Sequence, residues 1–116
     1  MRVSKDKVNS VLEEELAKSF LQLISDLKSA EESEIFLRDF LTKSEFSALT
    51  KRLAVAYWLK KKRSYKNIKD NIKVSSATIA DVQTKIKSSG YQLALKKIEA
   101  EEWANKWSEK IKRFVK

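Results

Sequence analysis

Basic residues gather in the middle of this 116-residue chain, at a density that could bind phosphate groups. Residues 51–90 contain eleven Lys or Arg and two Asp, which gives the stretch a net charge of 11 − 2 = +9. The rest of the chain has 14 basic and 14 acidic residues, so the whole formal charge of +9 lies in this stretch. A surface that contacts nucleic-acid phosphates needs such a separation of charge, whereas an ordinary solvated surface does not. The basic residues are Lys51, Arg52, Lys60, Lys61, Lys62, Arg63, Lys66, Lys69, Lys73, Lys85 and Lys87.

Two short helices are predicted inside this basic stretch, within residues 64–88. Ile68 and Ile72 are spaced to share one helix face, and Ile79 and Val82 are spaced to share another. Val74 lies in the connection between them, where it can fill the angle at which two short helices cross. The pattern therefore predicts a pair of crossing helices around a small apolar centre.

A serine stands at the predicted start of each short helix. Ser64 and Ser75 occupy N-cap positions, where a hydroxyl accepts from the free amides of the next turn. The pattern predicts a helix-turn-helix motif, whose second helix (76–87) would enter a DNA major groove. Lys73 and Lys69 depart from the usual motif, which favours glycine in the turn and a small residue at the crossing. An ordinary hairpin in a helical bundle is the alternative interpretation, and the concentration of charge favours DNA binding over it.

The second helix would present small and polar side chains to DNA. Ser76 and Thr84 can hydrogen-bond to base edges or phosphates. Ala77 and Ala80 can contact a thymine methyl group, and Asp81 can accept from a cytosine amino group. Because no Arg or Asn stands on this face, DNA shape and bridging water would carry much of the specificity. The predicted DNA-binding residues are Arg63, Tyr65, Lys66, Lys69, Lys73, Ser76, Ala77, Thr78, Ala80, Asp81, Thr84 and Lys87.

Three amphipathic or apolar helices are predicted before the motif. Apolar residues recur in steps of three and four over residues 5–28, which predicts one long helix. Ser29 and Glu32 match a capping box that opens a short helix, and Thr42 and Glu45 match a second one that opens a longer helix. The longer helix would run to about residue 59 and end in the basic run 60–63.

One further helix is predicted after the motif. Gly90 stands where a left-handed helix stop is expected, and an amphipathic helix follows over about 91–115. The sequence thus predicts an all-α fold of about six helices in a single domain, 1–116. Such a small domain has too little interior to bury both terminal apolar stripes. We therefore expect an intertwined homodimer in which the helices about 5–59 and 91–115 pack across a two-fold axis.

Composition excludes several other classes of protein. One glycine, no proline and 42% apolar residues indicate long helices rather than a β architecture or a disordered chain. The chain has no histidine and no cysteine, so we predict no enzyme activity, no metal site and no cofactor. No apolar run approaches a membrane span, and the start MRVSKDK is not that of a signal peptide. We expect a cytoplasmic protein that does not bind membranes.

Residues 41–90 resemble the tryptophan repressor superfamily, and above all its repressor-like branch of unassigned ligand. The resemblance rests on LTKSE at 41–45, AL at 48–49, RLAV at 52–55 and SATI at 76–79. It covers a little under half of the chain, and the order of helices extends it more loosely to the rest. The resemblance implies an all-helical intertwined dimer that binds operator DNA and represses transcription.

The resemblance also implies positions for a tryptophan corepressor. Thr42 and Arg52 match residues that line the family's indole pocket. Asp81 replaces the arginine that holds the corepressor carboxylate, Val82 replaces a glycine beside it, and Lys85 replaces a pocket serine. Since Asp81 would repel a carboxylate and Val82 would fill the space of a ligand, we predict no response to tryptophan.

We therefore predict a sequence-specific transcriptional regulator, a repressor, whose partners are double-stranded DNA and a second copy of the chain. The alternative is a helical protein–protein adaptor that kept the fold and lost specific DNA binding, which Asp81 in the groove helix favours. An enzyme would need Asp, Glu, Lys or Tyr partners, and no such constellation stands out. Recognition of double-stranded RNA by shape also remains open.

Overall fold

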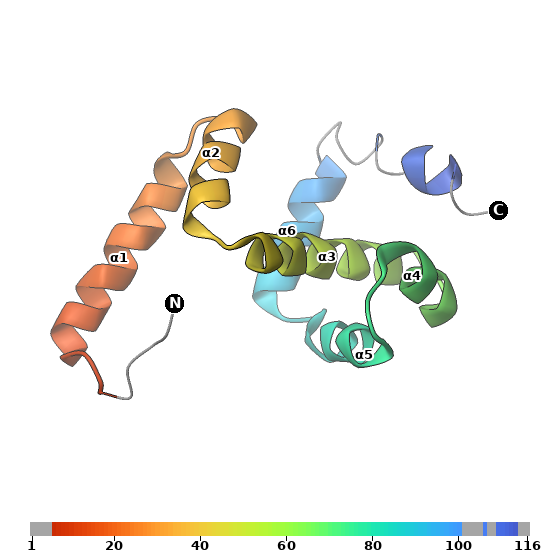
Figure 1. Cartoon of the computed structure of the whole chain (residues 1–116), viewed down its shortest axis with the longest axis horizontal. Helices are drawn as coiled ribbons and strands as arrows, with labels where there is room; N and C mark the ends of the chain where they lie inside the picture. Colours follow the sequence, from red (N-terminus) through yellow and green to blue (C-terminus); the bar gives the residue numbers. More distant parts are fainter. Residues whose placement is uncertain (1–5, 101–105, 107–108, 114–116) are drawn as a thin grey trace. The chain divides into compact units, whose positions relative to one another are not determined.

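The computed structural model describes residues 6–100, 106 and 109–113, and within these ranges every regular element is a helix. The described residues form two compact units, which divide between Thr42 and Lys43. The prediction of an all-α fold is confirmed. The helices are α1 (Ser10–Asp26), α2 (Ala30–Phe40), α3 (Lys43–Lys60), α4 (Tyr65–Ile72), α5 (Ser76–Lys85) and α6 (Ser89–Ala100), and residues 109–113 are also helical (Figure 1).

The first unit contains α1 and α2, joined by a short connection. Asn9 caps α1, since its Oδ1 accepts from the amides of Val11 and Leu12, so the helix begins later than the predicted residue 5. Ser29 caps α2 by accepting from the Glu32 amide at 3.0 Å. The Glu32 carboxylate accepts in return from the Lys28 amide, one residue before the amide that a regular capping box uses.

Neither helix of the first unit contains a buried residue. The aromatic ring of Phe36 lies 6.2 Å from that of Phe20 and 4.3 Å from that of Phe40, measured between centroids. The contact of Phe36 with Phe20 joins α1 and α2 without enclosing a core, because a pair of helices buries only one narrow seam. The predicted apolar stripe of α1 is therefore exposed, and Leu16, for example, retains 56% of its accessible surface.

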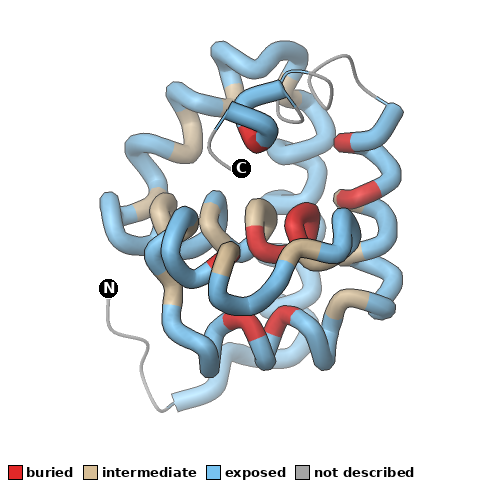
Figure 2. The backbone as a smooth tube through the Cα atoms, turned by 90° about the vertical axis from the view of Figure 1, so that its right-hand side faces the viewer, coloured by how far each residue is buried: buried red, intermediate tan, exposed pale blue. Residues whose placement is uncertain are grey.

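The second unit holds the hydrophobic core, and α3 is its central element. Helix α3 packs against α4, α5 and α6, so its residues Val55, Ala56, Tyr57 and Trp58 are all buried in succession. Figure 2 shows how short the buried segments are relative to the exposed backbone. The predicted inward-facing residues are confirmed: Ile68, Ile79 and Val82 are at most 1% exposed, and Val74 and Ile72 pack partly buried against this core.

The predicted helix stop at Gly90 is wrong. Gly90 is the second residue of α6, and no described glycine has a positive φ. Helix α5 ends instead in right-handed conformation at Ile86, and the Ser88 amide donates to the Lys85 carbonyl oxygen, so the chain turns into α6 without a left-handed residue. The two positive φ angles of the described chain, both 63°, belong to Lys62 and Lys73.

The final helix begins at Ser89, two residues before its predicted start. Leu95 and Ile98 of α6, and Ile111 further on, are buried in the core of the second unit. The predicted continuation through Trp103, Trp107 and Phe114 lies outside the described residues. No described helix is long and apolar enough to span a lipid bilayer.

Candidate nucleic-acid interface

Helices α4 and α5 form the predicted helix-turn-helix motif. The Ser64 hydroxyl accepts from the Asn67 amide at 3.1 Å, and the Ser75 hydroxyl accepts from the Thr78 amide at 3.1 Å, which confirms both predicted N-caps. Lys73 ends α4 in left-handed conformation, at the position where the motif usually has glycine. The turn is thus closed by backbone geometry that a lysine adopts at some cost, of the order of 1 kcal/mol.

One side-chain hydrogen bond joins the two helices of the motif. The Tyr65 hydroxyl, at the start of α4, donates to Oε1 of Gln83 on α5. Tyr65 is one of the predicted DNA-binding residues, and no local spacing signals a pairing across 18 residues. With its oxygen held by Tyr65, Gln83 has its amide N–H groups left to donate to another partner.

The groove side of α5 is exposed as predicted. Ile79 and Val82 face the core, while the predicted DNA-binding residues of α5 lie in the solvent. The Thr84 hydroxyl donates to the Asp81 carbonyl oxygen at 2.7 Å, so Thr84 can only accept from a further partner. The exposed residues are Ser76, Ala77, Thr78, Ala80, Asp81 and Thr84.

Some predicted phosphate-binding cations have a carboxylate neighbour one helical turn away. Lys66 contacts Asp70 at 2.7 Å, and Lys85 contacts Asp81 at 3.3 Å. The hydrogen bond from Lys66 and, next, its charge hold the pKa of Asp70 below its ordinary value, and the same pair raises the pKa of Lys66. Because both pairs are largely exposed, an approaching phosphate can replace the carboxylate as partner.

The basic run 60–63 divides between structural and exposed roles. Helix α3 ends at Lys60, whose ammonium group contacts Glu99 of α6 at 2.8 Å and lowers the pKa of that carboxyl, mainly through the hydrogen bond. Lys61 lies 5.4 Å above the ring of Tyr57. Arg63 is half-buried, and its Nε is buried without a hydrogen-bond partner among the described residues. Lys62 is the one residue of the run that is exposed and has neither an ion pair nor an aromatic contact in the described part of the chain.

Three of the predicted phosphate-binding lysines of the motif lie on the surface without an ion pair to any described residue. These are Lys69, in the last turn of α4, Lys73, at the end of α4, and Lys87, just after α5. They are the cations best suited to contact a nucleic-acid backbone.

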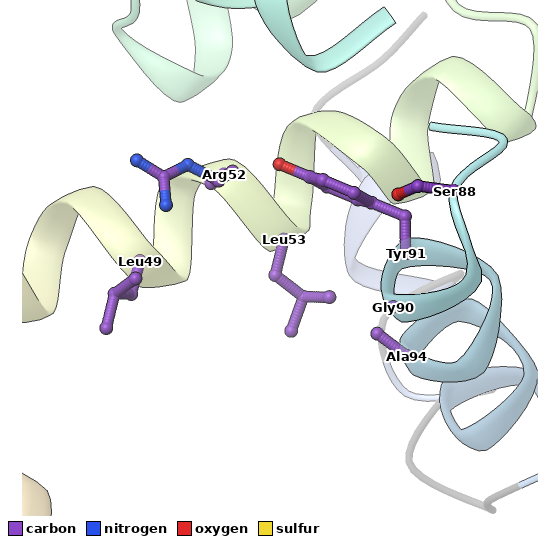
Figure 3. A pocket seen from close by; sticks show the side chains of 7 residues that line it. All are labelled: Leu49, Arg52, Leu53, Ser88, Gly90, Tyr91 and Ala94. Atoms are coloured by element: carbon purple, nitrogen blue, oxygen red, sulfur yellow. The ribbon is translucent and has the colours of Figure 1, made fainter. Parts of the chain in front are cut away.

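An apolar pocket lies between α3 and the start of α6 (Figure 3). The ring of Tyr91 extends from α6 across α3, with its hydroxyl on the side of Arg52. The pocket has a volume of about 430 Å³, and the exposed Arg52 forms part of its wall. Its walls consist of Leu49, Arg52, Leu53, Ser88, Gly90, Tyr91 and Ala94.

Three of the positions that match the family's corepressor site lie on α5, and Arg52, which matches another, lies in the wall of the apolar pocket. Asp81 pairs with Lys85 on the exposed side of α5, while Val82 is buried in the core. None of these three residues lies in the wall of the apolar pocket.

An all-helical unit with an exposed, basic helix-turn-helix defines the class of DNA-binding helical regulators. Residues 15–99 match the family model described as Trp repressor protein, so the chain belongs to the Trp repressor family. Membership identifies a helical DNA-binding regulator of the repressor kind and confirms the resemblance seen in the sequence. Neither the curated proteins nor the solved structures contain a match. The described residues contain no group of three or more side chains able to hold a metal ion.

Proposed function

We propose that this protein binds specific sites in duplex DNA by placing α5 in the major groove, and that it thereby represses transcription. We propose also that the protein is cytoplasmic. The supporting observation is that the entire net charge of +9 lies in residues 51–90, which contain an exposed helix-turn-helix face. The lysines would bind the phosphates and set the register. Ser76, Ala77 and Ala80 would then contact base edges, with Asp81 reading a cytosine amino group.

The proposed DNA-binding form is a homodimer. Helices α1 and α2 contain no buried residue, so a second copy of the chain would cover their apolar side chains. A two-fold axis would place two copies of α5 on successive major grooves, about one DNA turn apart.

We further propose that tryptophan does not change the DNA affinity. Asp81 carries a negative charge where the family's site needs a cation for the carboxylate, and its neighbour Lys85 pairs with it at 3.3 Å. The buried side chain of Val82 occupies the position at which the family has glycine. Saturating tryptophan should leave the affinity for DNA within about twofold, and a larger gain would contradict this proposal.

A salt series with duplex DNA tests the proposed DNA binding. The dissociation constant of the wild-type protein should rise steeply between low and physiological salt, because bound phosphates release counterions. Lys66→Glu with Lys69→Glu should weaken binding by about 100-fold or more and reduce the salt slope by about 2. Selection from random duplexes then identifies the preferred site.

The matched control replaces Lys18 and Lys28 by Glu. It makes the same change in net charge in the first unit, at residues that are not part of the motif, and should alter the affinity by less than about threefold. A wild-type protein that ignores DNA at low salt, or a control as defective as the α4 variant, would refute the proposed interface.

A protein–protein adaptor is the second candidate. The ion pair between Asp81 and Lys85 favours it, because it neutralises part of the exposed face of α5. An adaptor would show no binding to duplex DNA across the salt series, while retaining a folded, helical structure.

A further inference from the structure

A second pocket lies between the first half of α3 and the connection that joins α4 to α5. Its volume is about 430 Å³, and all of its walls belong to the second unit. It differs from the apolar pocket at Tyr91, with which it shares only Arg52. Its walls combine cations and hydroxyl groups with apolar side chains, whereas the pocket at Tyr91 is mostly apolar.

Three cations meet at this pocket without a carboxylate in its wall. Lys51 and Arg52 come from α3, and Lys73 comes from the turn. The Lys51 ammonium group donates to the Lys73 carbonyl oxygen at 3.3 Å, which holds it against the turn. Asp70 lies close enough to Lys73 to interact with its charge, but it is not part of the pocket wall. Like charges gathered at one pocket raise each other's energy, and a bound anion would lower this cost.

Hydroxyl groups complete the donor set. The Ser75 and Thr78 hydroxyl oxygens lie 3.0 Å apart, and the Ser75 oxygen also accepts from the Thr78 amide. Only one of the two hydroxyl protons can lie between these oxygens, so the other proton can be donated to a ligand. Ser47, on α3, also lines the pocket.

We propose that this pocket binds a phosphate group, supplied either by a free phosphate or by the DNA backbone. The ammonium groups of Lys51 and Lys73 and the guanidinium of Arg52 would balance its charge, and the free hydroxyl proton would bond to one of its oxygens. Since Lys73 also belongs to the proposed DNA-binding surface, a free phosphate in the pocket would compete with DNA. Binding of a free phosphate does not depend on the proposed function, whereas the DNA backbone as the source rests on it.

Titration of the full-length protein with inorganic phosphate tests the site. The amide resonances of Ser75 and Thr78 should shift and saturate, in excess of the response to sodium chloride at equal ionic strength. Lys51→Gln with Lys73→Asn should weaken this binding by about tenfold or more, because it removes two charged donors. Asparagine is chosen at position 73 because it tolerates the left-handed conformation.

The matched control is Lys62→Asn with Lys96→Gln. It removes one charge from the other left-handed position and one from an exposed helical site, and should change phosphate binding by less than about twofold. Circular dichroism verifies that both double variants remain folded. Equal weakening in both variants would overturn the proposed site.

Duplex DNA distinguishes the two sources of phosphate. If free phosphate does not saturate the shifts, but the pocket variant loses about tenfold more DNA affinity than the control, the DNA backbone supplies the group. If phosphate binds while the wild-type protein ignores DNA, the pocket stands and the proposed function fails. If DNA binds and neither test separates the pocket variant from the control, the function stands and the pocket proposal is overturned.

Discussion

Lys66 and Asp70 show how a single residue pair links stability to pH. The hydrogen bond from Lys66 lowers the pKa of Asp70 below its ordinary value of 3.8 in the folded protein. A carboxyl with a depressed folded pKa stabilises the fold at pH values above its unfolded pKa. This contribution is lost as the pH falls through the folded pKa.

We expect Asp70→Asn to lower the thermal unfolding temperature slightly at about pH 7 and to have no such effect at about pH 2. The unfolding temperature of both proteins, measured across this range, checks the prediction. Asp26→Asn is a suitable control, since Asp26 accepts a hydrogen bond from an uncharged group, the Gln22 amide. If the unfolding temperatures of the wild type and of Asp70→Asn differed by the same amount at all pH values, the loss of stability would be unrelated to the ionisation of Asp70.

The side chains of the motif also show which single residues the sequence could assign. Ser64 and Ser75 were recognised as caps because an N-cap acts on amides two or three residues away. The bonds from Tyr65 to Gln83 and from Lys60 to Glu99 were missed, because they cross 18 and 39 residues. Such partners become neighbours only through the packing of separate helices.

At the scale of the elements, the turn between α4 and α5 depends on Lys73 in left-handed conformation, with φ of 63°. We expect Lys73→Gly to raise the free energy of unfolding by up to about 1 kcal/mol, since glycine has no Cβ to oppose this conformation. Urea denaturation measures the change.

Lys69→Gly is the matched control, because it lies inside α4. Glycine there should lower the free energy of unfolding by about 1 kcal/mol. If both variants lowered the free energy of unfolding by a similar amount, the turn would not impose the left-handed conformation on residue 73.

The junction between α5 and α6 shows where a prediction from a local sequence pattern fails. A single glycine after an apolar run indicates a left-handed stop, yet Gly90 lies within α6. The Ser88 amide bonds to the Lys85 carbonyl oxygen, and the Gln92 side chain donates to the Ile86 carbonyl oxygen at 2.7 Å. These bonds satisfy the end of α5 without glycine, so no positive φ is required there.

At the scale of the molecule, the first unit has helices but no buried residue. We expect the wild-type protein to sediment as a dimer, and Leu12→Glu with Leu16→Glu to sediment as a monomer, since charges would enter the covered apolar stripe. The DNA affinity of this double variant should fall by about tenfold or more, because a monomer has only one recognition helix.

The control for this prediction is Lys18→Glu, on the polar side of the same helix, which should remain dimeric. Sedimentation velocity at micromolar concentration gives the molecular mass of each protein. A monomeric wild type that still binds DNA with full affinity would contradict the proposed dimer.

The sequence alone determined the two helices of the motif, their serine caps and the inward-facing Ile68, Ile79 and Val82, because helix periodicity and capping act over three or four residues. It also located the net charge, which depends only on residue types. Tertiary structure alone decided that Lys60 pairs with Glu99, and it brought Lys51, Arg52 and Lys73 to one pocket. The physical reason is that this ion pair and the pocket form between helices, and the sequence spacing within one helix does not specify how separate helices pack.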